Sequence, residues 1–296
     1  MNILITGGTG LIGSALIDRW HLQHQLIVLT RSVAKATHLA QKVQLVASLK
    51  QVDFNQLDAV INLAGEPIVG KRWSAPQKRQ LCDSRWLLTQ QVVSAISAAA
   101  TPPKVLISGS AIGVYGRQQQ QVIDEHFDQY YPEFASELCQ IWEQDALAAQ
   151  SAQTRVCLLR TGIVLAKQAG ALKKMLPAFK AGLGGPIGDG KQYMSWIHID
   201  DMVRIIDMLL HQSDLQGAIN ATAPEPVTNA AFAQQLAKVL HRPAILPMPA
   251  WLLKILLGEM ADLLITGQRV MPAKLLAAGF HFNYAALPQA LTALLD

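Results

Sequence analysis

A glycine-rich turn near the start of the chain constrains its fold more than any other feature. The residues Thr6–Gly13 read TGGTGLIG, directly after the apolar run Asn2–Thr6 and directly before a helical pattern. Glycine here allows a tight turn, lets backbone N–H groups approach a pyrophosphate and lets the helix pack on the strand, while the helix N-terminus favours an anion. The residues expected to hold the pyrophosphate of a dinucleotide are Gly7, Gly10, Leu11, Ile12 and Gly13.

Short β-rich runs alternate with helix-length segments as far as Arg160. We predict strands at Asn2–Thr6, Gln25–Thr30, Ala59–Leu63, Lys104–Ser108 and Arg155–Arg160. This rhythm predicts an α/β fold with a doubly wound parallel Rossmann sheet, covered on both faces, and a ligand crevice at the carboxyl ends of its strands.

The pattern changes after Arg160, where a small C-terminal substrate lobe is expected to begin. A helix is predicted near Gly170–Ala181, and a glycine-rich loop and the segment Ser195–Asp201 follow it. Two stretches punctuated by proline then bracket another helix. We expect residues 1–220 to form the dinucleotide-binding Rossmann domain, with 161–200 contributing to the lobe, and residues 221–296 to form a mostly helical extension.

Composition and charge argue against several other classes of protein. Of the 296 residues, 51% are hydrophobic and 16% are charged, which favours extensive burial over a disordered chain. The net charge of +4 is small and the basic residues are scattered, so we expect no nucleic-acid partner. Because the sequence has no signal-peptide pattern, no long apolar span and no paired cysteines, we expect a cytoplasmic protein without membrane contact or bound metal.

The end of the second predicted strand indicates which dinucleotide is bound. An Asp or Glu is expected there in proteins that bind the ribose 2′-hydroxyl of NAD. Here the strand ends Leu29-Thr30-Arg31-Ser32, with no carboxylate. Arg31 can pair with a 2′-phosphate and Ser32 can donate to it, so the sequence favours NADP(H) over NAD(H).

Ordered matches along nearly the whole chain resemble the short-chain dehydrogenase/reductase superfamily, in particular its extended, atypical group of epimerase family proteins. The matching pieces are TGGTGLIG at Thr6–Gly13, NLAGEPI at Asn62–Ile68, SR at Ser84 and Arg85, SGSAIGVYG at Ser108–Gly116, LRTGIVL at Leu159–Leu165, GLGGPIGDGKQYMSWIHIDD at Gly182–Asp201, NATAPEPVTN at Asn220–Asn229 and QRVMPAKLLAAGF at Gln268–Phe280.

The resemblance implies further cofactor contacts outside the glycine turn. Leu63, Ala64 and Gly65 end a strand where this family packs backbone against the adenosine half of the cofactor. Arg85 lies on the following helix, from which it can face the cofactor phosphates, and Ile163 occupies a loop that approaches the nicotinamide in similar proteins. A surface arginine and a core isoleucine are the alternative interpretations of the last two.

The resemblance weakens at the catalytic residues. Short-chain dehydrogenases use a Ser or Thr after the fifth strand and a Tyr-x-x-x-Lys pair on the next helix. Ser110 is the candidate serine, whose hydroxyl could hold a substrate oxygen. No tyrosine in this region is followed by lysine four residues later, and alignment through Trp142-Glu143 places Ala135 and Cys139 at the two positions.

Three side chains are candidates to replace the missing pair. Tyr115, in the Val-Tyr-Gly turn, joins Ser110 as a candidate catalytic residue. Glu137 and Cys139 are further alternatives, although a Glu on a helix surface is usually solvated and a lone Cys is usually a small buried hydrophobe.

The segment before the next predicted helix contains residues that resemble metal ligands. We interpret His198 instead as a buried polar link, and Asp200 and Asp201 as carboxylates that cap the helix N-terminus. Trp196 has two open interpretations, a ring that stacks on a ligand or a core residue.

Two classes of function stay open. The first is an NADP(H)-dependent oxidoreductase or epimerase acting on a small carbonyl or sugar-like molecule, with hydride exchange at the nicotinamide C4 supplying the chemistry. The second is a catalytically weak or inactive NADP(H)-binding regulator or scaffold, which the missing Tyr-Lys pair favours. A serine hydrolase is disfavoured, because the residues around Ser110 lack the G-x-S-x-G spacing.

Overall fold

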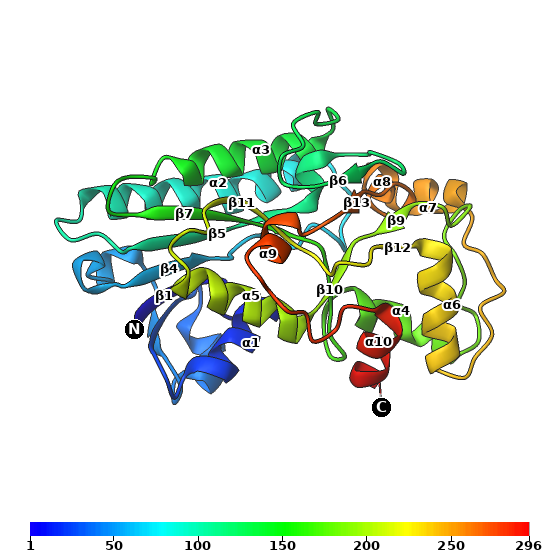
Figure 1. Ribbon diagram of the computed structural model, residues 1–296, viewed down its shortest axis with the longest axis horizontal. Coiled ribbons are helices and arrows are strands. Elements are labelled where there is room, and N and C mark those ends of the chain that lie inside the picture. The colour runs from blue at the N-terminus through cyan, green and yellow to red at the C-terminus, as the bar shows by residue number, and fades with distance from the viewer. Residues whose placement is uncertain (296) are drawn as a thin grey trace.

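A parallel sheet of seven strands forms the centre of the computed structural model, which describes residues 1–295 (Figure 1). The strands are β1 (Asn2–Thr6), β2 (Gln25–Leu29), β3 (Gln44–Val46), β4 (Ala59–Asn62), β5 (Val105–Ala111), β7 (Arg155–Thr161) and β11 (Gly217–Ala221). Their order is β11-β7-β5-β4-β1-β2-β3, and all neighbours pair in parallel. The order reverses between β1 and β4, which is where such sheets bind ligands. The predicted doubly wound α/β Rossmann fold is confirmed.

Helices cover both faces of this sheet. α1 (Leu11–Trp20) and α5 (Ile199–His211) lie on one face, and α2 (Ala75–Ala98) and α3 (Phe134–Leu147) lie on the other (Figure 1). α2 begins where the hydroxyl of Ser74 accepts the N–H of Gln77, with Pro76 in the first turn, a combination that favours a helix start.

Alternate residues of one strand supply the cores on the two faces of the sheet. In β1, Ile3 and Ile5 share a core with Leu16 of α1, whereas Leu4 shares the opposite core with Val92 of α2. All five side chains are fully buried, and each contributes roughly 1.5–3 kcal/mol to folding. A strand buried on both faces has to be apolar throughout, which explains the unbroken apolar run.

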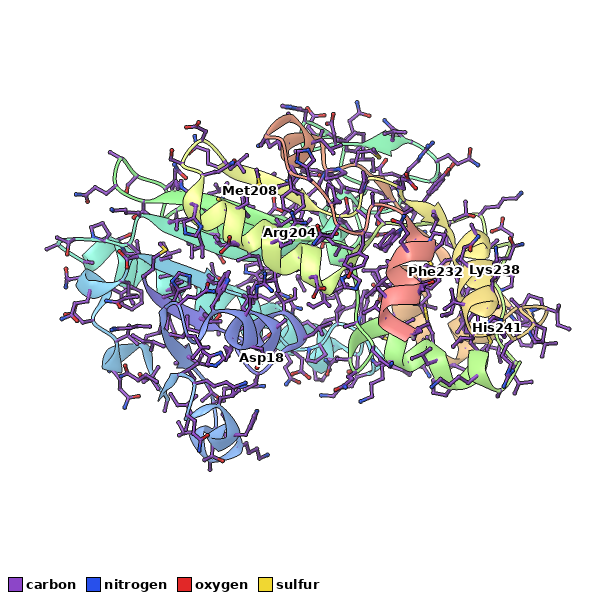
Figure 2. All side chains as sticks on the ribbon, turned by 60° about the horizontal axis from the view of Figure 1, so that its bottom comes forward. Asp18, Arg204, Met208, Phe232, Lys238 and His241 are labelled. Atoms are coloured by element: carbon purple, nitrogen blue, oxygen red, sulfur yellow. The ribbon has the colours of Figure 1, made fainter. Side chains whose placement is uncertain are left out.

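The C-terminal lobe is built from segments on both sides of β11 in the chain. Its elements are β8 (Ile163–Leu165), α4 (Gly170–Lys180), β9 (Tyr193–Met194), β10 (Trp196–His198), β12 (Val227–Thr228), α6 (Asn229–Val239), α7 (Ala250–Leu257), α8 (Asp262–Ile265) and α10 (Leu287–Leu295). β8 pairs in parallel with β10, and β9 pairs antiparallel with β12. The lobe has a core of its own, to which Phe232 of α6 and Leu291 of α10 belong, and the two helices lie side by side (Figure 2).

Several contacts join the lobe to the sheet domain. β6 (Val122–Ile123) pairs in parallel with β13 (Arg269–Val270), and α9 (Ala273–Ala277) lies next to β11. Two ion pairs also connect them, Lys78 with Glu259 and Arg117 with Asp262.

The sequence predicts five of the seven strands, with ends shifted by up to three residues. The largest shift is in β5, which continues to Ala111 and therefore includes Ser110. β3 and β11 are not among the predicted strands, and the expected boundary between residues 220 and 221 falls inside β11. Within residues 1–295, no helix is long and apolar enough to cross a membrane.

Candidate functional site

The glycine turn after β1 leaves the start of α1 open. Gly7 has a positive φ of +72°, and a Cβ on it would lie 2.7 Å from the carbonyl carbon of Leu63. Gly10 is the N-cap of α1 and contributes no side-chain hydrogen bond. The N–H groups of the first helical turn, which include those of Leu11, Ile12 and Gly13, therefore remain available for an anion.

A cavity of about 570 Å³ lies next to Arg31. Arg31 is exposed at the end of β2, and Ser32 begins a short 3-10 helix. The opposite wall of the cavity comes from the first turns of α2 and includes Arg79 and Ser84. The sequence alone does not single out Arg79, which is one of several scattered basic residues. The fold brings it to the cavity that Arg31 also lines.

Hydrogen bonds tie the segment after β4 to the glycine turn. Thr6 Oγ1 donates to Asn62 Oδ1 at 2.7 Å and accepts the N–H of Ala64 at 3.1 Å. Asn62 in turn donates to Thr89 of α2 at 2.8 Å. These hydrogen bonds fix the backbone of the segment that begins at Leu63 beside the turn.

Arg85 lies under this segment. Its Nη2 donates to the carbonyl oxygen of Glu66 at 3.0 Å, and its Nη1 donates to that of Leu81 at 3.0 Å. A Cβ on Gly65 would lie 3.0 Å from Arg85 Cζ, so glycine is what allows the close approach. Burial lowers the pKa of the Arg85 guanidinium. Arg85 is therefore a partly desolvated cation and not a surface arginine.

Ser110 belongs to a buried polar network. Its hydroxyl donates to Glu143 Oε1 at 2.6 Å, and the Glu143 carboxylate accepts from Arg160 Nε at 2.8 Å and from Nη2 at 2.7 Å. Burial disfavours the charge of Arg160, but the hydrogen bond and the charge of Glu143 together raise its pKa above the ordinary value. The sequence alone does not predict that Glu143 and Arg160 belong to this network. Glu143 serves there only to align the helix, and Arg160 only ends a predicted strand.

Tyr115 occupies the far end of the same network. Its hydroxyl donates to Asn220 Oδ1 at 2.7 Å and accepts from Arg160 Nη1 at 2.9 Å. Burial raises the pKa of Tyr115 to about 12, although the nearby Arg160 charge opposes this shift. The structure thus brings Ser110 and Tyr115 together through Glu143 and Arg160.

The positions aligned with the Tyr-Lys pair are both buried. Ala135 is 3% exposed and Cys139 is 2% exposed. Burial raises the pKa of the Cys139 thiol to about 12, so this group is neutral at physiological pH. Glu137, by contrast, is exposed on the outer side of α3.

The remaining sequence candidates belong to the lobe. Ile163 is half-buried and packs against the lobe core. Trp196 is fully buried, and its indole N–H donates to the carbonyl oxygen of Glu225. It is therefore a core residue and not a ring that stacks on a ligand. Among the described residues, no group of three or more His, Cys, Asp or Glu side chains could hold a metal ion.

His198 and Asp201 tie the start of α5 to the C-terminal segment. His198 Nδ1 accepts the N–H of Asp200, and its ring stacks on Tyr284 with centroids 3.7 Å apart. The buried Asp201 carboxylate accepts the N–H groups of Asn283 at 3.0 Å and Tyr284 at 2.9 Å. The expectation that Asp200 and Asp201 cap the helix is therefore wrong, because His198 is the N-cap of α5. The Asp201 carboxylate is directed instead to a segment more than eighty positions later in the chain and to Arg204, at 2.7 Å.

Residues 3–221 match the sequence profile of the NAD dependent epimerase/dehydratase family. The chain belongs to this family. A second match covers residues 248–294, which correspond to a domain of unknown function (DUF1731).

Members similar to this chain along its whole length are epimerase family proteins. The "Epimerase family protein SDR39U1 homolog, chloroplastic" of Arabidopsis thaliana is 40% identical over 305 aligned residues, which cover 100% of this chain and 87% of that protein. An epimerase family protein of Mycobacterium leprae is 39% identical and covers 98% of this chain and 94% of its own length. The resemblance inferred from the sequence motifs is confirmed.

Two solved structures share the fold of this chain. The crystal structure of human epimerase family protein SDR39U1 (isoform 2) with NADPH matches with a TM-score of 0.92 and 32% identity, covering 99% of both chains. UDP-glucuronic acid 4-epimerase from Bacillus cereus matches with a TM-score of 0.78 over 99% of this chain and 95% of that chain. At 17% identity, the second match speaks to the fold alone.

Proposed function

We propose that this chain is an NADP(H)-binding, epimerase-like oxidoreductase that acts on a small carbonyl or sugar-like molecule. The observation that carries the proposal is the uncapped first turn of α1, where the N–H groups of Leu11, Ile12 and Gly13 are open to a pyrophosphate. The human relative that shares the fold was crystallised with NADPH, which supports the same cofactor for this chain.

The proposed site of the 2′-phosphate of NADP(H) is the cavity beside Arg31. Arg31, which follows β2, and Arg79 of α2 supply two positive charges to its lining, and Asp83 supplies one negative charge. Arginine suits this task, because its fork of N–H groups matches a phosphate. In the family pattern a carboxylate at this position would instead bind an unphosphorylated ribose.

Cofactor titration tests this assignment. NADPH should bind wild-type protein more tightly than NADH does, as measured by the fluorescence of the reduced nicotinamide. Arg31→Ala should weaken NADPH roughly ten- to hundredfold and NADH little, because a hydrogen bond to a charged group contributes about 1.5–3 kcal/mol. Equal losses for the two dinucleotides would overturn the assignment.

When bound, NADP(H) supplies hydride exchange at the nicotinamide C4. The residue proposed to hold the substrate oxygen is Ser110, which Glu143 orients through the 2.6 Å hydrogen bond. Tyr115 is proposed to act through Arg160, since its own hydroxyl already donates to Asn220 and accepts from Arg160. Its burial and its pKa of about 12 argue against proton transfer by Tyr115 itself.

A regulator or scaffold that binds NADP(H) without turnover is the second candidate function. The observation in its favour is that Ala135 and the neutral, buried Cys139 stand where the family has its Tyr-Lys pair. Screening carbonyl compounds and nucleotide sugars with NADPH separates the two candidates. Tight NADPH binding together with failure of the whole screen would favour the regulator.

A cytoplasmic location also belongs to the proposal. The three cysteines are all free and buried, which suits a reducing compartment. Cell fractionation of the tagged protein checks it, and recovery in another compartment would contradict it.

A further inference from the structure

We propose that the outer end of the C-terminal lobe binds the surface of a bilayer that contains anionic lipid, through an exposed apolar patch with a basic rim. The patch consists of the large apolar side chains that lie exposed on α7 and on the two loop segments beside it: Leu183, Ile245, Leu246, Met248, Trp251, Ile255 and Leu256. None of these residues lines the cavity beside Arg31, so their role does not depend on the proposed function.

Backbone pairing between the two loop segments holds part of the patch in place. The N–H of Met248 donates to the carbonyl oxygen of Pro186 at 2.8 Å, and the N–H of Gly188 donates to that of Met248 at 2.9 Å. Pro247 and Pro249 flank Met248 and have no N–H with which to extend this pairing. The loop therefore displays its apolar side chains from a fixed backbone.

α7 presents apolar side chains to the outside. Within Ala250–Leu257, Leu253 is the only buried residue, whereas Trp251 is 64% exposed and Ile255 is 62% exposed. Residues four apart are neighbours on a helix, so this tryptophan and this isoleucine form one outward ridge. α7 and the loop before it lie at the end of the molecule away from the central sheet (Figure 1). Exposed apolar patches of this kind mark contact surfaces for a partner or a membrane.

Three cations lie at the rim of the patch. Lys254 lies on α7 between Trp251 and Ile255 in the sequence. Arg242 Nε donates to the carbonyl oxygen of Lys180 at 3.1 Å, so these two residues lie side by side at the end of α4. Each of the two stands three positions before a residue of the patch. Basic residues beside exposed apolar side chains are typical of surfaces that lie on a bilayer.

The segments that carry the patch contain basic residues and no acidic ones. Segments 163–188 and 226–258 have no Asp or Glu and seven basic residues, Lys167, Lys173, Lys174, Lys180, Lys238, Arg242 and Lys254. None of the seven forms an ion pair within residues 1–295. Three acidic residues border these segments directly, Asp189, Glu225 and Glu259. Glu259 is paired with Lys78 at 2.6 Å. The outer end of the lobe is therefore positively charged.

This charge decides between the occupants that an apolar patch can take. A second copy of this chain, docked patch to patch, would bring two basic rims together, and like charges across an interface are unfavourable. An anionic leaflet has the opposite charge and attracts basic residues that come within a Debye length. Tryptophan suits the boundary between headgroups and acyl chains, where one end of its ring is wet and the other apolar. The patch therefore fits an anionic bilayer surface.

A surface contact differs from a segment that spans the bilayer. It needs only an apolar face at the level of the headgroups with basic residues around it. A contact of this kind departs from the expectation of no membrane contact, which considered signal and spanning segments only. It holds the protein reversibly on the face of a membrane that borders the cytoplasm, so it agrees with the proposed location.

Flotation with lipid vesicles tests the proposal. Wild-type protein should float with vesicles of equal parts phosphatidylcholine and phosphatidylglycerol, and not with vesicles of phosphatidylcholine alone. Raising the salt from about 0.1 M to about 1 M should release it, because the Debye length falls from about 10 Å to about 3 Å. Lys254→Ala should weaken binding roughly fivefold. Lys50→Ala, which removes an exposed cation of the sheet domain, is the control and should bind like wild type.

Variants of the outward ridge separate insertion from attraction by charge alone. The double variant Trp251→Ser, Ile255→Ser should weaken binding by a factor of roughly ten or more, because two apolar side chains no longer leave water. Leu22→Ser changes a leucine of the sheet domain that is 87% exposed, and it should bind like wild type. Thermal melts check the fold of each variant, and loss of these exposed side chains should leave the melting temperature unchanged.

Brominated lipid locates the contact on the protein. Of the six tryptophans, all within residues 1–295, Trp251 alone is exposed. Bromine on the acyl chains should therefore quench the fluorescence of wild-type protein bound to anionic vesicles. Trp251→Phe should lose this quenching and keep most of the binding, because phenylalanine retains an apolar ring.

Absence of flotation with the anionic vesicles would overturn the proposal, and so would equal flotation with the neutral ones. Flotation that the double serine variant leaves unchanged would show that binding uses another surface. Light scattering adds a last check. A wild-type dimer that the double serine variant converts to a monomer would assign the patch to a second copy of the chain and overturn the membrane contact.

Discussion

The hydroxyl of Ser110 donates to Oε1 of Glu143 across 2.6 Å, and the same carboxylate is held by two nitrogens of Arg160. Because the Ser110 proton is directed at Glu143, its oxygen offers lone pairs to a ligand. In this geometry Ser110 accepts from a substrate hydroxyl without rearrangement, whereas a carbonyl oxygen requires the Ser110 proton to turn away from Glu143.

Removing Glu143 should destabilise the protein more than removing Ser110. Glu143→Ala leaves Arg160 buried without its carboxylate, and we expect the free energy of unfolding to fall by about 3–5 kcal/mol. Ser110→Ala removes one hydrogen bond to a charged acceptor and should cost about 1.5–3 kcal/mol or less. Urea denaturation measures both. The exposed Glu137→Ala on the same helix is the control, and a Glu143→Ala variant as stable as this control would contradict the network.

Turnover, once a substrate is found, should depend on Ser110 and not on Cys139. Loss of one oriented hydrogen-bonding group typically lowers a rate by a factor on the order of a hundred to a thousand, so Ser110→Ala should approach that loss. Cys139→Ala should change little, because the thiol is neutral and buried. Steady-state rates of the two variants, with Tyr115→Phe for comparison, decide the point. Unchanged kinetics of Ser110→Ala would remove this turn from the mechanism.

Gly10→Val and Gly13→Val should both lose cofactor binding, but for different reasons. A Cβ on Gly10 meets only the carbonyl oxygen of Gly7, at 3.2 Å, so Gly10→Val should fold and obstruct the cofactor. A Cβ on Gly13 would overlap that same carbonyl oxygen and lie 2.6 Å from the Cα of Gly8, so Gly13→Val should also lower the melting temperature. Calorimetry and thermal melts separate the two effects. Normal NADPH affinity in Gly10→Val would argue against this turn as the pyrophosphate site.

Stability should fall in alkaline solution as Tyr115 titrates. Burial raises its pKa from 10.0 to about 12, so its contribution is complete below pH 10 and is lost as the pH rises through 12. At pH 11 the loss amounts to about 1.4 kcal/mol. Urea denaturation at pH 8 and pH 11 should show a smaller pH effect for Tyr115→Phe than for wild type. Identical pH effects would mean that Tyr115 is not buried as described.

Patterns in the chain predict the sheet better than they predict the site. Strands such as β1 are apolar on both faces and therefore recognisable, whereas β3 has only three residues and β11 reads GAINA, with little apolar surface. Glycine spacing predicts a pyrophosphate turn because the chemistry is local to one segment. The contact between Glu143 and Arg160 is not local, since it forms only when α3 packs on β7, and no spacing in the chain indicates it.

The carboxylate of Asp201 links the two stretches of the chain that match different family profiles. Asp201 lies within the stretch that matches the epimerase family profile, and the N–H groups that it accepts belong to Asn283 and Tyr284, within the stretch that matches the second profile. Exchange of the second stretch for an unrelated sequence would remove these two donors and leave the buried carboxylate with its ion pair to Arg204 at 2.7 Å. We therefore expect a chimaera joined at the border between the two profiles to be less stable than this chain, because two hydrogen bonds to a buried carboxylate cross that border.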